Sequence, residues 1–333
     1  MKKIIIHIIL VCIFISCQEI ENNEILAPIT NLEIDDSDYI LNKKFSKGDS
    51  RRYGVFPNRV VGKKELLNII TLSERGLPIT FINGRYDTDM ILNKVSNVNF
   101  IFKNVIINGS INITNGSNKI KLSGSLTVLD KLFIKESTNI IFDTLLVKSD
   151  IIKNNFNKKN RGVSIYSGSK GIKFKSLKIV DTGGNSDDFY THSAAALQIH
   201  GWNNNPQNIQ INTLEINNSA RTALYITGMN HKIKKVAITN FGTGSAKNIF
   251  GLEDASPGEE KEFSGFWMNK CNNCEIDSLS INNTANSGVY SLRLDEGLYH
   301  KPSFINNINF KNEAIGMTIK DDILTNILVK NEY

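Results

Sequence analysis

The feature that most constrains this fold is a short pattern that recurs along the chain. It consists of an apolar residue, two polar or small residues, another apolar residue, a spacer, and then Ile, Val, Leu or Phe. The copies begin at Phe102, Phe142, Phe174, Ile211, Ile233, Ile276 and Ile305. Their starts differ by 40, 32, 37, 22, 43 and 29 residues. The shortest repeat is therefore 22 residues long, and the longer repeats contain insertions. Self-similarity of this kind predicts a solenoid.

The spacing within each copy is typical of strands that end at a polar corner, not of helices. A second set of strands precedes the first, and its alignment places in one column Val163, Leu197, Leu224, Phe266 and Val289. Two residues further on lie Ile165, Ile199, Ile226, Met268 and Ser291. Because strand side chains alternate between faces, both columns are expected to point inward. The pattern predicts an all-β fold, a right-handed parallel β-helix; an antiparallel sandwich would require regular hairpin signals, which are absent.

A polar column is expected at one corner of the coils. Six residues after the first buried column come Ser169, Asn203, Asn230, Asn272 and Asp295. Stacked Asn side chains can hydrogen-bond from one coil to the next, which satisfies polar groups at the corner. We therefore expect a ladder of polar side chains there.

The start of the domain suggests a cap. Apolar residues fall at helical spacing over 61–75, and 76–86 then reads as a Gly, an apolar strand and an Asn-Gly turn ending at Tyr86. This arrangement resembles the opening of the pectin/pectate-lyase-like superfamily of parallel β-helices. The resemblance implies an N-terminal capping helix, a β-helix domain over 56–333, and a substrate, usually a polysaccharide and often an acidic one, lying along the first sheet.

The N-terminus has the layout of an export signal. Lys2 and Lys3 precede an apolar run over 4–15, which is too short to span a bilayer. The residues ending at Cys17 resemble a bacterial lipobox, and Glu19 and Glu21 resemble the acidic flank of surface lipoproteins of the Bacteroidetes. We expect a lipoprotein signal over 1–17 with Cys17 lipidated, a tether over 18–55, and an outer-membrane location facing the periplasm or the cell surface. A plain cleavable signal is the alternative.

Aromatic residues occupy the outward positions between the two buried columns. These positions hold Ser164, Gln198, Tyr225, Trp267 and Tyr290. Aromatic faces beside sugar rings form a carbohydrate platform, because the C–H face of a sugar is apolar. The alternative is that the rings only stabilise the sheet by stacking on each other. With these residues we group His200 at the end of its strand and Tyr190 in a neighbouring turn as candidate substrate contacts.

Two long turns, over about 181–194 and 240–264, are expected to overhang this face. For a lyase, Arg221 or a bound metal would neutralise the uronate carboxylate, and His192 or a second Arg or Lys would take the C5 proton. Tyr225 would protonate the leaving oxygen. For a hydrolase, Asp187 or Asp188 would face Glu253 or Asp254 across the bond. The acidic turn is alternatively a solvated surface or a weak calcium site, and calcium is the only cofactor that the sequence suggests.

The net charge and the cysteines say less about function than the repeat does. The formal charge of +6 favours anionic partners, but no basic stripe can be aligned to one face, so nucleic acid is not expected. Cys271 and Cys274 form either a corner disulfide or a pair of packed thiols. We expect a monomer that degrades a uronic-acid polysaccharide, as a lyase ahead of a hydrolase. A non-catalytic glycan-binding or adhesive surface lipoprotein is the alternative from another class.

Overall fold

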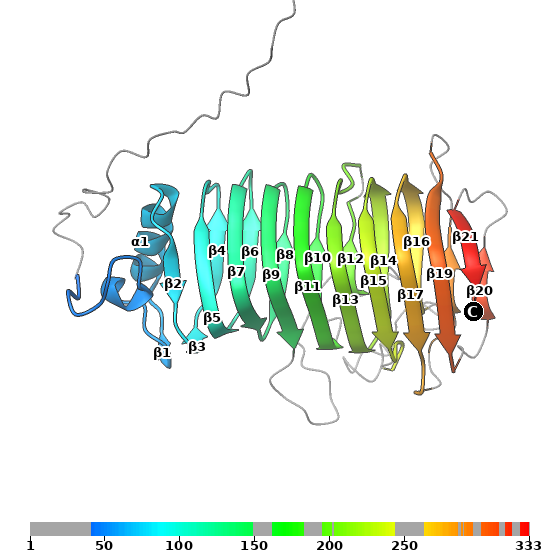
Figure 1. The fold of residues 1–333 in the computed structure, drawn as a ribbon, viewed down its shortest axis with the longest axis horizontal. Coiled ribbons are helices and arrows are strands. Elements are labelled where there is room, and N and C mark those ends of the chain that lie inside the picture. The colour runs from blue at the N-terminus through cyan, green and yellow to red at the C-terminus, as the bar shows by residue number, and fades with distance from the viewer. Residues whose placement is uncertain are drawn as a thin grey trace, which may run out of the picture.

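The computed structural model describes residues 41–148, 162–182, 195–201, 203–243, 263–285, 288, 290–295, 301–312, 317–321 and 327–332, with side chains up to residue 312. Its strands form a 12-stranded and a 9-stranded sheet, and all pairings are parallel. The chain alternates between the two sheets, so successive strands of each sheet belong to successive coils (Figure 1). This is the predicted parallel β-helix.

The 12-stranded sheet contains, in chain order, β1 (Arg59–Val60), β2 (Ile79–Phe81), β3 (Gly84–Asp87), β5 (Asn99–Asn108), β7 (Asn118–Val128), β9 (Thr138–Lys148), β11 (Lys170–Thr182), β13 (Gln210–Ser219), β15 (Lys232–Thr239), β17 (Glu275–Asn282), β19 (Ser303–Lys311) and β21 (Ile327–Glu332). The 9-stranded sheet contains β4 (Met90–Asn93), β6 (Ile111–Thr114), β8 (Lys131–Ile134), β10 (Gly162–Ile165), β12 (Ala195–Ile199), β14 (Thr222–Met229), β16 (Ser264–Asn272), β18 (Tyr290–Leu294) and β20 (Met317–Asp321).

The core lies between the two sheets, where apolar side chains stack in register. The predicted column is confirmed from Val163 through Leu197 and Leu224 to Phe266. All four residues are fully buried. Each coil therefore buries its apolar side chains against the same positions of its neighbours, so the core continues along the axis of the solenoid.

The predicted alignment of the last coil in this column is wrong. Leu292, not Val289, pairs with Phe266, and Leu294 pairs with Met268. Val289 itself lies outside the described residues. The alternation that suggested Val289 and Ser291 fits Leu292 and Leu294 equally well. The observed register places Leu292 and Leu294 in the buried columns, and the apolar area that they remove from water stabilises it.

Asn side chains do connect neighbouring coils: the predicted position Asn230 is confirmed, but its partner lies one residue after the predicted Asn272. Asn273 Nδ2 donates to Asn230 Oδ1 at 2.7 Å, whereas Asn272 Oδ1 accepts from the backbone N–H of Lys301. Asn230 and Asn273 both have left-handed backbones, with φ of 59° and 56°. Asn adopts this conformation more readily than other non-glycine residues. The one-residue error arises because the corner requires Asn for its backbone as well as for its side chain.

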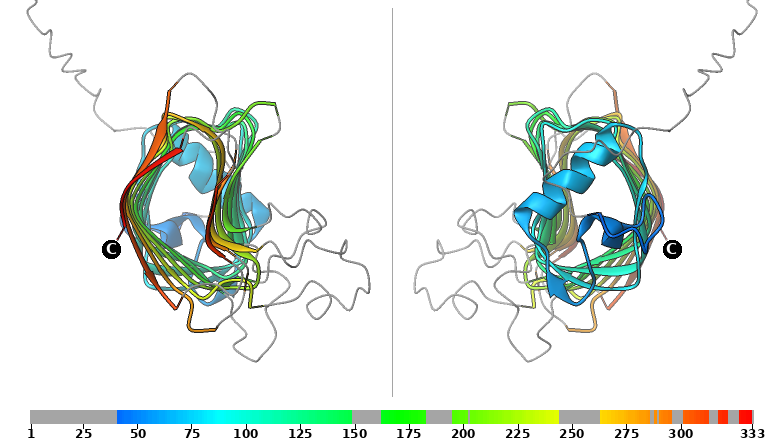
Figure 2. Two further views of the ribbon diagram at one scale, coloured as in Figure 1. Left: turned by 90° about the vertical axis from the view of Figure 1, so that its right-hand side faces the viewer. Right: turned by 90° about the vertical axis from the view of Figure 1, so that its left-hand side faces the viewer.

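A helix closes the N-terminal end of the solenoid, as predicted. α1 (Lys63–Glu74) lies across the open end of the coils (Figure 2). It buries Leu66, Ile69, Ile70 and Leu72, while Leu67 is 60% exposed. The helix thus covers the apolar interior that the first coil would otherwise present to water.

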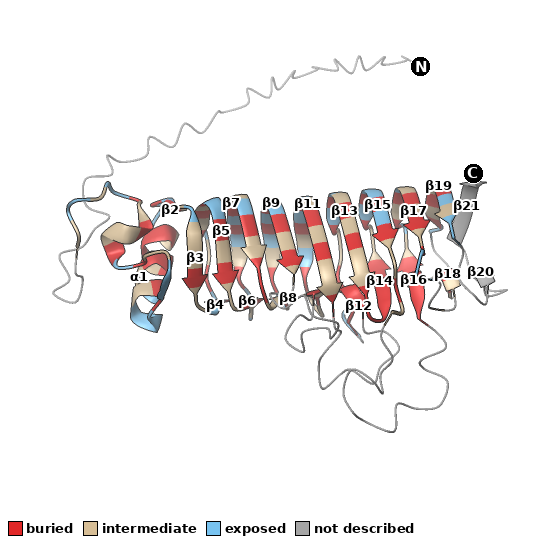
Figure 3. Cartoon of the chain, turned by 90° about the horizontal axis from the view of Figure 1, so that it is seen from below, coloured by how far each residue is buried: buried red, intermediate tan, exposed pale blue. Residues whose placement is uncertain are grey.

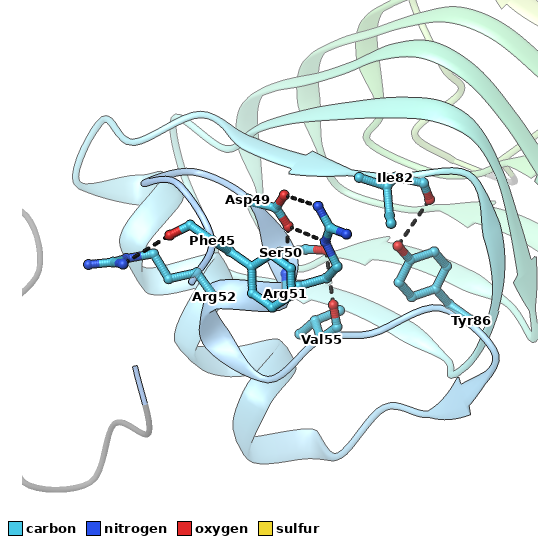
Figure 4. Close-up of polar contacts among 8 residues, drawn as sticks. All are labelled: Phe45, Asp49, Ser50, Arg51, Arg52, Val55, Ile82 and Tyr86. Atoms are coloured by element: carbon cyan, nitrogen blue, oxygen red, sulfur yellow. Dashed lines mark hydrogen bonds and ion pairs between the residues drawn. The ribbon is translucent and has the colours of Figure 1, made fainter. Parts of the chain in front are cut away.

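Residues 41–55, predicted as part of the tether, instead belong to the cap. They include the 3-10 helix η1 (Ser50–Tyr53), which is N-capped by Asp49. Asp49 also forms an ion pair with Arg51 at 2.7 Å, and Arg51 stacks on Phe45 (Figure 4). Tyr53 is 3% exposed and Val55 is fully buried. The segment reads as polar because charged residues that pair locally precede its two apolar anchors.

Lysines gather on the outer face of the 12-stranded sheet, which the sequence analysis did not anticipate. Strands β7, β9, β11, β13 and β15 contain ten Lys against the acidic residues Asp143, Asp181 and Glu215. The pairing register aligns several of these lysines. We call the exposed residues Lys121, Lys173, Lys175, Lys232, Lys234 and Lys235 the lysine strip.

Candidate functional site

A continuous row of ring side chains crosses the outer face of the 9-stranded sheet. Its members, which we call the aromatic row, are Phe133, Tyr166, His200, Tyr225 and Trp267. Neighbouring ring centroids are 6.1, 5.7, 5.5 and 4.7 Å apart in that order. They come from β8, the ends of β10 and β12, β14 and β16, which are consecutive strands. The row therefore runs along the axis of the solenoid.

Exposure changes along the aromatic row. Phe133 and Tyr166 are partly exposed, His200 is 9% exposed, and Tyr225 and Trp267 are 3% and 1% exposed. β14 and β16 are accordingly buried over most of their length, whereas strands of the 12-stranded sheet alternate between buried and exposed residues (Figure 3). The predicted aromatic platform at Tyr225 and Trp267 is therefore withdrawn from solvent. The ring surface that remains open lies at Phe133 and Tyr166.

The buried end of the row finishes at an Arg–Trp–Asp cluster. The guanidinium carbon of Arg293 lies 4.0 Å from the centroid of a Trp267 ring. Asp295 accepts hydrogen bonds from Trp267 Nε1 at 2.8 Å and from Arg293 Nε at 3.3 Å. Asp295 thus holds the cation over the indole, where the ring quadrupole also attracts it. This arrangement fixes the Arg293 guanidinium at the end of the row, where it forms an ion pair with Asp295.

Tyr225 keeps its phenolic proton in this setting. Its hydroxyl accepts a hydrogen bond from Asn269 Nδ2 at 3.1 Å. Burial raises the pKa of Tyr225 to about 12, an effect only partly opposed by the bond from Asn269. The hydroxyl is therefore protonated at neutral pH and can act as a proton donor.

His200 and Gln198 lie between the exposed and buried ends. The His200 ring packs against both Tyr166 and Tyr225. Gln198 pairs with Ser164 on one side and Tyr225 on the other, as predicted, and it is partly exposed. His200 and Tyr225 are therefore adjacent titratable groups on one outer face.

Arg221 does not join the aromatic row. It precedes β14, is 3% exposed, and its guanidinium carbon lies 5.3 Å from the centroid of the Phe263 ring. Three residues separate it from Tyr225 along the chain. The catalytic role expected for Arg221 stays a prediction. The cation beside the tyrosine and tryptophan is Arg293.

Tyr290 is also displaced from its predicted position. It pairs with Ser264, and Arg293 takes the place beside Trp267. This follows from the register error in the last coil, since a shift of three residues moves Tyr290 to the start of β18. His192, Asp188, Asp254, Tyr190 and Cys17 lie outside the described residues, as do Asp187 and Glu253.

Sequence reasoning missed Phe133, Tyr166, Arg293, Asn269 and Asp295 as members of this site. The signal for Phe133 was present, because Leu132 and Ile134 continue the two buried columns and Phe133 pairs with Ser164. Extending the alignment by one coil would have found it. The roles of Asn269 and Asp295 could not be predicted from the sequence, because their partners depend on the register of β16 and β18.

The described residues contain neither a metal-binding cluster nor a membrane-spanning helix. No cluster of three or more His, Cys, Asp or Glu side chains suited to a metal ion occurs there. Within the same ranges, no helix is both long and apolar enough to cross a bilayer. The acidic turn with Asp254, where calcium was considered, is not among these residues.

The sequence and fold were also compared with known proteins. No family model matches the chain, and no curated protein and no solved structure matches it.

Proposed function

We propose that this protein binds a linear, uronic-acid-containing polysaccharide along the outer face of the 9-stranded sheet and cleaves it as a lyase. The observation that carries the proposal is the aromatic row, which ends at the fixed cation Arg293. The row follows the solenoid axis over consecutive coils, so its shape suits an extended polymer. A β-helix fold hosts many activities, and the proposal rests on this face alone.

Binding would begin at the exposed end. Phe133 and Tyr166 offer partly exposed rings tilted by 36° to each other, on which the apolar face of a sugar can stack. Lys131 Nζ lies 5.9 Å from the Phe133 ring centroid and adds a positive charge there. An anionic sugar chain would thus meet a cation at each end of the row.

The chemistry would use groups at the buried end. Arg293 would neutralise the uronate carboxylate, which acidifies the C5 proton, and neutral His200 would remove that proton. The electrons form a C4=C5 double bond as the C4–O bond breaks. Tyr225, which keeps its proton because burial raises its pKa to about 12, would protonate the leaving oxygen. No oxidant or water enters the balance.

A glycan-binding protein without cleavage is the second candidate. It is favoured by the internal hydrogen bonds of Tyr225 and Arg293 and by their low exposure. Hydrolysis receives less support, because it needs two opposed carboxylates. Among the described residues, Asp295 is one carboxylate that has a hydrogen bond to a member of the row.

The proposal includes a cellular location. We infer from the lipobox-like residues that Cys17 anchors the protein to the outer membrane, where extracellular polysaccharide is accessible. Replacing Cys17 with Ser in the full chain should move the protein from the membrane fraction to the soluble fraction of the periplasm. Retention of the Cys17→Ser protein in the membrane fraction would contradict this anchoring through Cys17.

The enzymatic part is tested by incubating residues 18–333 with uronate-containing polysaccharides, with and without calcium, and following the ultraviolet absorbance of the unsaturated product. The expected result is a rise that Tyr225→Phe lowers at least about 100-fold, the scale of general acid catalysis. Tyr290→Phe is the matched control, since Tyr290 lies outside the row.

Three other outcomes of this assay would change the proposed function. New reducing ends without absorbance would indicate hydrolysis and overturn the lyase assignment. Binding without either product would leave the glycan-binding function. Equal loss of activity in Tyr225→Phe and Tyr290→Phe would show that the chemistry lies elsewhere on the molecule.

A further inference from the structure

The lysine strip lies on the sheet opposite to the aromatic row, and its charges are mostly without acidic partners. Lys121, Lys173, Lys175, Lys234 and Lys235 are exposed and form no ion pair with any described residue. Lys232 is 3.7 Å from Glu275, but both side chains are well exposed. Pairs of this kind are worth little in water. The strip therefore presents a concentrated positive charge to solvent.

The lysines of the strip recur at a regular distance along the solenoid. In one line of paired residues, Lys121, Lys173 and Lys232 alternate with Ile141 and Gln210. Neighbouring strands are about 4.8 Å apart, so the lysines recur at roughly 10 Å. Beside this line, Lys175 and Lys234 are again separated by one intervening strand, β13.

The strip ends on its C-terminal side at an acidic strand. On the C-terminal side the next strand, β17, carries Glu275 and Asp277 and no basic residue. Glu275 pairs directly with Lys232 in the sheet. From β7 to β15 the strip extends over roughly 19 Å, at about 4.8 Å a strand. It is an elongated site along the axis and not a charged plane.

We propose that the lysine strip is a second binding site, which takes a linear anionic polysaccharide carrying one negative group on every second sugar. Two linked sugars are about as long as the spacing of roughly 10 Å between strip lysines, which is twice the spacing of strands. The exposed amide of Gln210 and the apolar side chain of Ile141, which is 40% exposed, lie between the cations and contact the uncharged sugar.

This surface is independent of the aromatic row, because the two lie on opposite sheets. A polymer bound to the lysine strip would stay attached to the protein whether or not the aromatic row binds or cleaves it. An anionic membrane suits the strip less well, since acidic residues of β17 border it. Nucleic acid suits it less well too, because its phosphates follow one another more closely than the lysines do.

The test is the affinity of residues 18–333 for κ-carrageenan oligosaccharides, which carry one sulfate on every second sugar and no uronate, measured by calorimetric titration over a range of salt concentrations. The triple variant Lys121→Gln, Lys173→Gln, Lys232→Gln removes the line of cations and should weaken binding about tenfold, with a flatter salt dependence. The matched control is Lys43→Gln, Lys63→Gln, Lys301→Gln, which removes equal charge from exposed sites outside the strip.

The control distinguishes this proposal from general electrostatic attraction. Equal weakening by the two triple variants would overturn the strip as a site. Tighter binding of anionic phospholipid vesicles or duplex DNA than of the κ-carrageenan oligosaccharides would overturn the assigned partner, as would no binding at all. A Tyr166→Ala variant, which alters the aromatic row, should leave this affinity unchanged and so separates the two sites.

Discussion

At the scale of single residues, a buried histidine shows how the interior accommodates a polar group. His231 is fully buried. Its Nδ1 accepts from the backbone N–H of Ile209 at 3.2 Å, and its Nε2 lies 2.8 Å from the Thr227 carbonyl oxygen. An amide only donates and a carbonyl only accepts, so the ring is the neutral Nε2–H tautomer. Burial lowers the pKa of His231 to about 4.

This predicts a loss of stability on acidification. The pKa of His231 is lowered from 6.5 to about 4 on folding, so between these values the unfolded chain binds more protons than the folded one. The contribution is complete above pH 6.5 and is lost as the pH falls toward 4, amounting to about 3 kcal/mol.

Denaturant titrations at several pH values measure this effect. The variant His231→Gln should be less stable at neutral pH but should lose less stability than the native chain on acidification. Parallel curves for the two proteins would show that His231 is not the titrating group.

A second residue-scale prediction concerns the two cysteines. Cys271 and Cys274 are free and buried, and burial raises the pKa of the Cys271 thiol. Residues 18–333 should therefore react slowly with a thiol reagent when folded, and should release both thiols in denaturant without reductant. The absence of any thiol after denaturation would mean that the pair is a disulfide.

Single residues were the level at which sequence reasoning was least reliable. It found Tyr225 and Trp267 on the outer face but could not show that both are buried. It chose Arg221 as the cation because Arg221 lies in the short turn between the two long turns, whereas Arg293 reaches Trp267 from the next coil. Contacts between coils depend on register, and an error of three residues is enough to exchange Tyr290 for Arg293.

At the scale of elements, one irregularity shapes the site. The pairing of β14 with β16 shifts between Ile226 and Gly228, just after Tyr225 and Trp267. Gly228 has φ of 111°, and a Cβ there would overlap the carbonyl oxygen of Pro206 and meet His231 Nε2 at 2.9 Å. The bulge therefore needs glycine for its backbone conformation and for space.

Replacing this glycine should be costly. We expect Gly228→Ala to destabilise the protein by about 1–3 kcal/mol more than Gly116→Ala, because the methyl group must displace packed backbone. Gly116 is the matched control, since it too has a positive φ, 84°, but no atom lies within 4 Å of its added Cβ. Denaturation midpoints compare the variants, and equal midpoints would contradict this account of the bulge.

Elements were more predictable than single residues. The helix over 61–75 was found as α1, and four of five coils in the buried column were aligned correctly. Periodicity identifies such elements because each must bury one face. The segment over 41–55 was missed, since a short capped turn anchored by Tyr53 and Val55 has no periodicity to detect.

At the scale of the whole molecule, the parallel β-helix turns local repeats into extended surfaces. Because coils stack in register, one side chain per coil becomes a line along the axis. One sheet carries the aromatic row and the other carries the lysine strip. Under both proposals, the stacked coils together match the length, direction and charge of a polymer, which no single coil could do.

The most direct test of the central claim is calorimetric titration of residues 18–333 with uronate oligosaccharides of increasing length. Affinity should rise with each added sugar until the oligosaccharide is as long as the row from Phe133 to Arg293, roughly 24 Å at about 4.8 Å a strand. Tyr166→Ala should reduce that affinity, while Tyr290→Phe should not. Affinity independent of length, or unchanged in Tyr166→Ala, would contradict binding along the aromatic row.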